Sequence, residues 1–419
     1  MVFRGRIRLF LGKRVLVINN SKRINKLSKI LLIFEQVNVR AFKTMSLKNI
    51  YITGFILFSL QGFGNSSSSV IERSYETVPD SLSGYIEIAA HLTRDLVSDT
   101  EKARALYIWL SHNIQYNLSQ KNAEVSYSSV DEIIDEALKT KTGVCQHYAE
   151  LFHAMGQSVG LDTYVITGYT RNKAGEIADL GHAWNGIAID SKHYLMDVTW
   201  AAGYEQNGKY VHQFRDEYFM ISPEIMIQSH MPFDPVFQFL NNPLNNKEFI
   251  SKDFSKLEKP GNFAFNDTIQ QERKFTRLEQ LEFSSRRIKT NGIQNKLIQK
   301  QLNNNLLQIA TIKYNTAIDT LNYGVENYNL YVTHKNKQFR NPTLEDKYIM
   351  ELIENAERAA FTSNEMLYGL LSPSQELNTL IADVRRKLAV IMPELKKEME
   401  FVEKYLNTWK PFRMMLFVK

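Results

Sequence analysis

The sequence predicts an α+β domain followed by an all-α helical region, and three features of its apolar pattern support this prediction. Within residues 81–240, apolar residues recur at helical spacing in some stretches and form short strand-like runs in others. From about residue 264 onward, strong helical spacing returns. Between these parts, residues 241–262 are rich in Asn, Lys, Asp and Pro, which is typical of a linker or an extended surface segment. We therefore expect one domain at 65–250 and a helical region at 251–419.

The positive charge of the chain is concentrated in its first segment. The formal net charge is +6, but residues 1–44 hold 11 basic residues and 1 acidic residue, so the rest of the chain is mildly acidic. Nucleic-acid binding needs a clustered basic face, so no nucleic-acid partner is expected. The single cysteine, Cys145, excludes an internal disulfide.

Residues 1–64 are predicted to be a basic leader followed by a signal peptide. Lys48 gives a positive start, and Ile50–Leu60 form an apolar run about as long as a signal-peptide core. The small residues Gly62 and Gly64 then precede a polar, Ser-rich stretch. This pattern predicts export to the periplasm or the extracellular space.

Two alternatives remain for this leader. In the first, Met45 is the true start and the preceding 44 residues are an over-extension of the reading frame. In the second, the longer form is real and residues 50–60 stay uncleaved as a membrane anchor. After cleavage no stable membrane span is expected, because the apolar run is too short to cross a bilayer comfortably.

Three helices are expected at the start of the first domain, at Tyr85–Leu96, Glu101–Ile114 and Val130–Leu138. In the second of these, Asp99 or Thr100 can cap the helix start, where a negative charge is also favoured by the helix dipole.

A fourth predicted helix places the cysteine at its first turn. Apolar residues recur at helical spacing from Val144 to Val159, and Gly160 follows as a natural stop. Unpaired backbone N–H groups and the dipole at a helix start lower the pKa of a thiol from its free value of roughly 8.5. The position of Cys145 therefore suits a nucleophile. A strand-like run, Thr163–Tyr169, comes next.

Two strand-like runs, 181–190 and 193–200, are separated by a short polar turn and predict a β-hairpin. A two-residue loop would set Asp197 opposite Trp184 and make His182 the diagonal neighbour of Asp197, with α-carbons about 7–8 Å apart. Their side chains could bridge that gap, whereas a loop one residue longer would turn them to opposite faces.

These three side chains have the chemistry of a catalytic triad. We predict Cys145 as the nucleophile, His182 as the general base and Asp197 as the group that orients the histidine. The backbone N–H of Cys145 is the preferred oxyanion donor. Trp184 and Trp200 flank the histidine and the aspartate, and they either wall a substrate pocket or simply pack.

No cofactor or metal ion is expected. The histidines lack paired Cys, Asp or Glu at metal-ligand spacing, and no Gly-rich phosphate-binding loop is present. We expect structural roles for His147, His153 and His230, and we expect His193 to lie exposed beside the hairpin turn.

The sequence resembles the transglutaminase-like (papain-like) superfamily, and within it the kyphoscoliosis-peptidase type. The matching pieces are Lys102–Trp109 with Asn113–Tyr116, Gly143–Cys145 with Tyr148-Ala149, Gly168-Tyr169, His182–Asn185, Asp197–Trp200 with Gly203-Tyr204, Tyr218-Phe219, Pro223, Ser229-His230, Pro232 and Pro235. The order Cys–His–Asp also matches, and the resemblance covers residues 85–240.

The resemblance implies a papain-like core, in which the cysteine helix packs against a small antiparallel sheet. It also implies the roles already given to Cys145, His182 and Asp197. It does not select one reaction, because such proteins include cross-linking acyltransferases, peptidases, amidases and members without activity.

The helical region is expected to form a bundle or long helical hairpins. Apolar residues form one stripe from Leu297 to Leu321, and Asn341-Pro342-Thr343 marks a break. Further helices are expected at Tyr348–Leu370 and Ser374–Ile391, with another beginning at Pro393. An apolar tail, Met414–Val418, is expected to dock on the bundle. This region is a candidate surface for a protein partner.

The sequence thus predicts an exported, cysteine-dependent enzyme that cleaves peptide or amide bonds through a thioester, most simply a cysteine peptidase acting on a protein or peptide. A protein-cross-linking transglutaminase is the enzymatic alternative. A catalytically idle protein-binding module is the non-enzymatic alternative.

The leader generates a first testable prediction. The exported protein should begin near Asn65, because small residues and then a polar stretch follow the apolar run. Mass spectrometry of the periplasmic or secreted protein would identify this N-terminus. Recovery of an intact 1–64 segment on a cytoplasmic protein would contradict the prediction.

Overall fold

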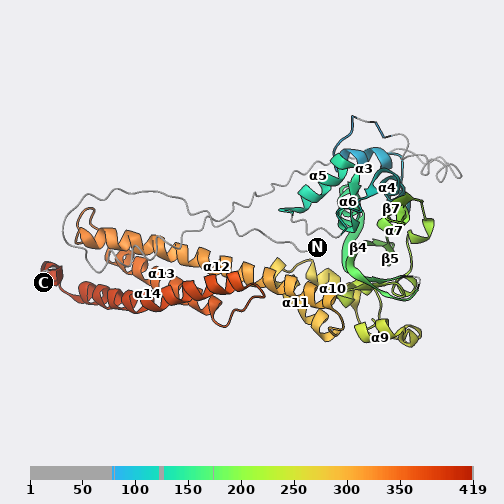
Figure 1. The fold of residues 1–419 in the computed structure, drawn as a ribbon. Helices are drawn as coiled ribbons and strands as arrows, with labels where there is room; N and C mark the ends of the chain where they lie inside the picture. Colours follow the sequence, from blue (N-terminus) through green and yellow to red (C-terminus); the bar gives the residue numbers. More distant parts are fainter. Residues whose placement is uncertain (1–77, 80, 122–126, 173, 418–419) are drawn as a thin grey trace. The chain divides into compact units, whose positions relative to one another are not determined.

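The computed structural model describes residues 78–417, apart from 80, 122–126 and 173 (Figure 1). The predicted leader and signal peptide lie outside the described residues. Contacts group the described residues into two compact units, 78–305 and 306–417. The first unit is mixed α and β and the second is all helical, so the predicted fold class is confirmed. The boundary predicted after residue 250 stays a prediction, because a grouping of contacts does not test which residues fold independently.

The helices of the first unit agree closely with the predicted ones. They are α3 (Tyr85–Thr93), α4 (Asp99–Asn113), α5 (Val130–Thr140) and α6 (Cys145–Ser158). Their apolar faces meet in one core that includes Ile88, Leu106, Trp109, Phe152 and Met155. The predicted caps of α4 were wrong. Ser98 caps this helix and forms a capping box with Glu101, which satisfies two N–H groups that Asp99 or Thr100 would have left open.

A four-stranded antiparallel sheet packs against α6, in the order β5-β4-β3-β8. Its strands are β3 (Asp162–Arg171), β4 (Ile177–Ile189), β5 (Lys192–Met196) and β8 (His230–Pro232). The predicted hairpin register between β4 and β5 is confirmed, since Asn185 pairs with Met196 and Ile189 with Lys192. The turn residues Asp190 and Ser191 both have positive φ angles, 48° and 63°, as a tight two-residue hairpin loop requires.

The second hairpin run is shorter than predicted. It ends at Met196, and residues 198–202 form the short helix α7 (Val198–Ala202). Asp197 is the N-cap of α7, and its Oδ1 atom accepts a hydrogen bond of 3.0 Å from the Trp200 backbone N–H. An aspartate that satisfies a free N–H in this way favours a helix start over strand continuation.

The remaining elements of the mixed unit are short. A parallel pair joins β1 (Gln115–Tyr116) to β2 (Thr142–Gly143), directly before α6. An antiparallel pair joins β6 (Gly203–Gln206) to β7 (Lys209–His212). The 3-10 turn η2 (Asp216–Tyr218), the helix α8 (Pro223–Met226) and the 3-10 turn η3 (Pro235–Gln238) follow in the chain.

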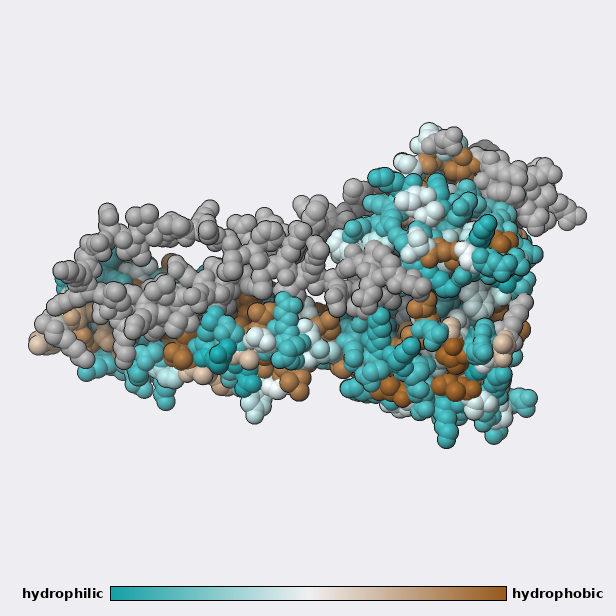
Figure 2. All heavy atoms as spheres, viewed as in Figure 1, coloured by the Kyte–Doolittle hydropathy of each residue, from teal (hydrophilic) through white to brown (hydrophobic). Residues whose placement is uncertain are grey.

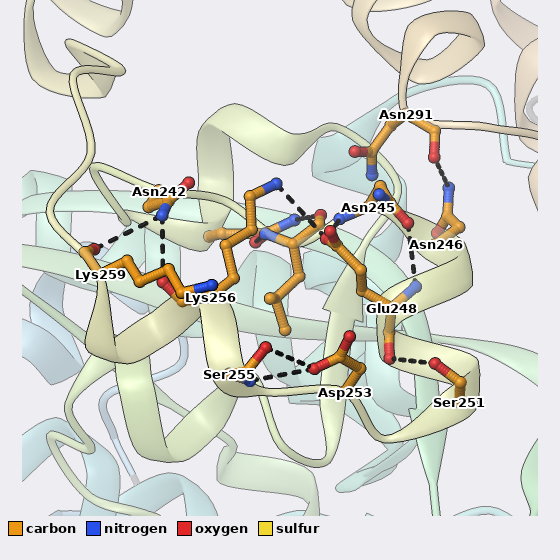
Figure 3. A network of polar contacts seen from close by, with 12 residues as sticks. Asn242, Asn245, Asn246, Glu248, Ser251, Asp253, Ser255, Lys256, Lys259 and Asn291 are labelled. Carbon is orange, nitrogen blue, oxygen red and sulfur yellow. Dashed lines mark hydrogen bonds and ion pairs between the residues drawn. The ribbon is translucent and has the colours of Figure 1, made fainter.

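The segment 241–262 differs from the expected linker. It contains α9 (Asn246–Ser251) and the 3-10 turn η4 (Ser255–Glu258), and Phe249 is fully buried. Figure 3 shows its asparagine, serine and acidic side chains bonded to one another and to nearby backbone. Asn246 also donates to the carbonyls of Asn291 and Gly292. The polar residues that suggested a linker are therefore used in local hydrogen bonds that fix the segment.

Two helices after this segment are joined to each other and to the turn after β8 by ion pairs. They are α10 (Phe265–Glu272) and α11 (Arg277–Thr290). The Arg287 guanidinium binds both carboxylate oxygens of Asp234 at 2.7 Å, and it also pairs with Glu272. Such a two-pronged arginine–carboxylate contact fixes orientation as well as distance. It explains why α10 and α11 group with the mixed unit.

The helical unit is built from long helices. The division between the units falls within α12 (Lys296–Asn336), and α13 (Asp346–Leu367), α14 (Gln375–Asn407) and the 3-10 turn η5 (Lys410–Phe417) follow. The predicted break at 341–343 is confirmed, since it lies between the end of α12 and the start of α13. The predicted helix end before Pro393 was wrong, because α14 continues through Pro393. Buried Ile391 and Leu395 lie on either side of it, so burial of one continuous apolar stripe outweighs the lost backbone hydrogen bond.

The apolar tail docks on the helical unit as predicted. Leu416 and Phe417 pack against its core, where the Phe417 ring contacts Phe339, Phe401 and Tyr405. On the face seen in Figure 2, exposed apolar side chains are scattered among hydrophilic ones, which is ordinary for a protein surface. Among the described helices, none has both the length and the apolar character needed to cross a membrane.

The Arg287 contacts generate a stability prediction. Arg287→Ala should lower the free energy of unfolding by about 3 kcal/mol, because it leaves the largely buried Asp234 carboxylate without its cation. Arg286→Ala, at the exposed neighbouring position of α11, is the matched control and should cost under ~0.5 kcal/mol. Urea denaturation followed by tryptophan fluorescence measures both. Equal effects of the two substitutions would contradict this role of the ion pair.

Candidate active site

Cys145 is the first residue of α6. Its own N–H is among the helix-start donors that no turn of α6 can satisfy, so the sulfur lies beside a cluster of positive dipole ends. The thiol is half-buried. Gly143 makes this placement possible, because a Cβ at that position would lie only 2.5 Å from the Cβ of His147. The predicted helix-start position of the nucleophile is thus present in the structure.

His147 stabilises the start of α6 and has no contact with the thiol. Its Nδ1 atom accepts the Val144 N–H at 3.2 Å, and its Nε2 atom lies 3.0 Å from the Tyr127 hydroxyl. The ring is fully buried, and burial lowers its pKa. A neutral ring with its proton on Nε2 fits both contacts. This arrangement agrees with the structural role expected for His147.

Strand β4 brings His182 to the cysteine. Asn185, three residues further along β4, is fully buried and donates to the carbonyl of Ala149 on α6 at 2.9 Å. This bond fixes β4 against the cysteine helix. The His182 ring and the Ala183 backbone N–H both act on the Cys145 sulfur and lower the pKa of the thiol.

Asp197 is completely buried beside His182. Its Oδ2 atom accepts the His182 Nε2–H at 2.7 Å, while its Oδ1 atom is the cap acceptor of α7. Since Nε2 of His182 is held by Asp197, Nδ1 is the ring nitrogen left to exchange a proton with the thiol. The structure therefore brings Cys145, His182 and Asp197 together, and the hairpin register predicted the proximity of His182 and Asp197.

His230 is a fourth member of this cluster, and its place here was missed from the sequence. Its Nε2 atom lies 3.1 Å from the same Oδ2 atom of Asp197, and its ring is buried. It comes from β8, which pairs with β3 beside Gly168. A Cβ on Gly168 would lie 2.1 Å from the Met231 carbonyl, so the glycine is what lets β8 approach so closely. The Ser229-His230 piece of the family resemblance was the one signal that could have indicated it.

The pKa shifts describe a charged cluster. Burial alone would raise the pKa of the Cys145 thiol, but the hydrogen bond and charge of His182 and the N–H of Ala183 outweigh it and lower that pKa. Burial disfavours a charged His182, yet Asp197 and Cys145 together raise its pKa to about 10. Burial also opposes a charged Asp197, but His182 and His230 hold its pKa well below the usual range. At neutral pH these directions favour a thiolate, an imidazolium and a carboxylate.

The two predicted pocket tryptophans enclose the histidines. The Trp184 ring stacks on His182, with ring centroids 6.0 Å apart, and is fully buried. The Trp200 ring lies 5.7 Å from His182 and 4.5 Å from His230, and it stays partly exposed. Trp184 thus packs behind the imidazolium, whereas Trp200 also reaches solvent. A role of either in a substrate pocket stays a prediction.

One group of described residues could in principle hold a metal ion. The ligand atoms of His182, Asp197 and His230 lie within 4.8 Å of one another. However, the Nε2 atoms of both rings lie at hydrogen-bond distance from Asp197 Oδ2, so a metal would have to displace two protons from a largely buried cluster. The donor set fits a hydrogen-bonded triad better than a metal centre.

Comparisons with known proteins find matches to the part of the chain that contains this cluster. The model of the transglutaminase-like superfamily matches residues 86–198, a range that contains Cys145, His182 and Asp197. The kyphoscoliosis peptidases of Mus musculus and Homo sapiens are 27% and 26% identical to this chain over 185 residues. Each match covers 42% of this chain and 27% of the relative. A solved structure described as a TGase is 18% identical, with 37% of each chain covered and a TM-score of 0.23.

The predicted resemblance to the transglutaminase-like superfamily, of the kyphoscoliosis-peptidase type, is therefore confirmed for the matched part of the mixed unit. The core is transglutaminase-like, with the cysteine helix on a small antiparallel sheet. The matched part spans only about a quarter of the length of these curated relatives.

The charged cluster generates a prediction for the thiol. Cys145 should react with iodoacetamide at mildly acidic pH, because a lowered pKa leaves thiolate present below the ordinary range of roughly 8.5. His182→Ala should shift the inflection of the alkylation rate upward, since the main stabiliser of the thiolate is lost. The chain has one cysteine, so the rate reports Cys145 alone. An ordinary thiol pKa in both proteins would contradict the charged cluster.

Proposed function

We propose that this protein is an exported cysteine-dependent enzyme that cleaves peptide or amide bonds through a thioester, most simply a cysteine peptidase. One observation carries the proposal: a thiol at a helix start interacts with a histidine whose other nitrogen donates to a fully buried carboxylate. A nucleophile, a base and an orienting group in this relation are the components of acyl transfer. The match to the transglutaminase-like superfamily supports the same class of chemistry.

In the proposed reaction, the Cys145 thiolate attacks the carbonyl carbon of an amide. The oxygen becomes negative and is stabilised by the backbone N–H of Cys145 at the start of α6. The C–N bond then breaks as the His182 imidazolium gives its Nδ1 proton to the leaving nitrogen, which leaves a thioester on Cys145. Neutral His182 next takes a proton from water, the hydroxide adds to the thioester, and the C–S bond breaks to release the acid and restore the thiolate.

Asp197 has two effects in this scheme. Its hydrogen bond keeps the His182 ring oriented with Nδ1 toward Cys145, and its charge stabilises the imidazolium. The protein is proposed to act on protein or peptide substrates in the periplasm or outside the cell, with the helical unit available to a protein partner.

The triad generates a prediction for activity. Cys145→Ala should abolish amide cleavage and keep the fold, because a half-buried first-turn residue contributes little packing. Asp197→Asn should lower kcat by about 10⁴-fold, as in serine triads where the same change leaves a wrong histidine tautomer. Cleavage should decline above about pH 10, where His182 loses its proton. Activity of the Cys145→Ala protein equal to that of the parent would rule out the proposed nucleophile.

The decisive experiment is incubation of the mature protein with a proteome, with and without a labelled primary amine. New peptide N-termini that depend on Cys145 would identify a peptidase. Labelled amine joined to glutamine side chains, without new N-termini, would overturn hydrolysis in favour of cross-linking. Neither product, together with an unreactive thiol, would leave the chain as a binding module and would refute the proposal.

A further inference from the structure

We propose that His230 is a positioning residue that keeps Asp197 ionised and in place when His182 gives its proton away. The inference rests on the proposed function of the Cys145–His182–Asp197 cluster. It assigns to this site a fourth side chain, one that acts through Asp197 without touching the reacting atoms.

His230 donates to Asp197 without displacing either of the other two donors to this carboxylate. Asp197 Oδ2 accepts from His182 at 2.7 Å and from His230 at 3.1 Å, while Oδ1 accepts the Trp200 N–H at 3.0 Å. Three donors on three separate elements thus hold one carboxylate. The side chains of Asp197 and His230 are both inaccessible to solvent, so no water could replace the His230 donor without rearrangement.

The proton of His230 is fixed on the nitrogen that faces Asp197. Its Nδ1 atom lies 2.8 Å from the Ser229 hydroxyl. The same hydroxyl also lies 3.4 Å from the Met226 carbonyl oxygen, but its contact with Nδ1 is the shorter one. An ionised carboxylate can only accept, so in a neutral ring the proton lies on Nε2 at Asp197, and Nδ1 accepts from the hydroxyl. The Trp200 and Trp184 rings contact the imidazole, with centroids 4.5 Å and 5.2 Å away, and they fix its plane. Ser229 and the tryptophans therefore preset a donor aimed at Oδ2.

His230 is a neutral donor and not a second cation. The titratable groups that act on it are Asp197, from the cap of α7, and His182, from β4. Burial lowers the pKa of His230 and the charge on His182 adds to this effect, and together they outweigh the attraction of Asp197. A neutral ring stabilises the carboxylate charge through its N–H dipole. His182 therefore remains the group of this pair that gives and takes the proton.

The difference between a neutral His230 and a charged His182 matters at one step of the proposed reaction. Once His182 has given its Nδ1 proton to the leaving nitrogen, Asp197 remains as a buried anion without a cationic partner. Burial favours the protonated form of such a carboxylate. The N–H groups of His230 and Trp200 stabilise the anion at this stage, so it does not retain the His182 proton. Removing the His230 donor should therefore raise the pKa values of the neighbouring groups, because a positive dipole end is lost.

The test uses the alkylation rate of the single cysteine as a function of pH. In the parent, the thiol should give a lower inflection and His182 an upper one near pH 10. His230→Leu should move both inflections to higher pH, the upper one by on the order of one pH unit. His230→Gln, whose amide N–H can occupy the place of Nε2, should stay close to the parent. His193→Gln is the matched control on β5 and should leave both inflections unchanged.

A gentler variant covers the case in which His230→Leu fails to fold. Ser229→Ala removes the hydroxyl that fixes the tautomer, so it should shift the inflections in the same direction by a smaller amount. Unchanged inflections in folded His230→Leu, or in Ser229→Ala if the leucine variant does not fold, would overturn the inference. An equal shift in the glutamine and leucine variants would overturn it too, since the donor would then not matter. A parent with one ordinary thiol inflection would instead refute the proposed function, which keeps the two failures distinct.

Discussion

The buried carboxylate of Asp197 is the constraint on which the site depends. An ion removed from water costs several kcal/mol unless partners replace the water, and each hydrogen bond to a charged group returns about 1.5–3 kcal/mol. Asp197 has no exposed surface and receives three such bonds, from β4, β8 and the first turn of α7. The hairpin, the close approach of β8 beside Gly168 and the start of α7 must therefore all be in place before this charge can be buried. A carboxylate that needs three elements at once also fixes those elements relative to each other.

Asp197 lowers the pKa of the Cys145 thiol only through its effect on His182. Acting directly, the negative carboxylate raises the pKa of the Cys145 thiol, and burial raises it further. The imidazolium that Asp197 stabilises lies between them and is in contact with the thiol, so its opposing effect prevails and the thiol pKa falls. The sign of the pKa shift is thus set by proximity, because the cation is adjacent to the sulfur and the anion is not. This is a physical reason for the order cysteine, histidine, aspartate in space.

The parts of the site that depend on local periodicity could be predicted from the sequence, and the parts that depend on distant pairing could not. A 3.6-residue apolar period placed Cys145 at a helix start, and a two-residue turn fixed the register that brings His182 near Asp197. His230 could not be placed, because its position follows from pairing between β8 and β3 over some 60 residues of chain. Asp197 as a helix cap was missed since its strand-like apolar neighbours hid the helix signal. Polar composition at 241–262 was equally ambiguous, because asparagines that favour linkers also cap helices and bond to backbone.

The raised pKa of His182 favours the protonated ring, whereas the proposed reaction requires this ring to release its proton. Part of the shift comes from Asp197 and part from the Cys145 thiolate. When the thiolate attacks a carbonyl, its charge moves to the oxygen and then, as the C–N bond breaks, to the leaving nitrogen that takes the proton. The sulfur is then neutral, so the cysteine contribution to the His182 pKa disappears. The imidazolium becomes a stronger acid at the stage when the nitrogen needs a proton, and in the thioester the neutral ring is ready to act as a base. Formation of the bond to sulfur thus changes the acidity of the histidine, while Asp197, held by His230 and the Trp200 backbone N–H, keeps its charge and its position. In the proposed reaction, a cluster that favours thiolate at rest can therefore supply a proton in the next step without moving any side chain.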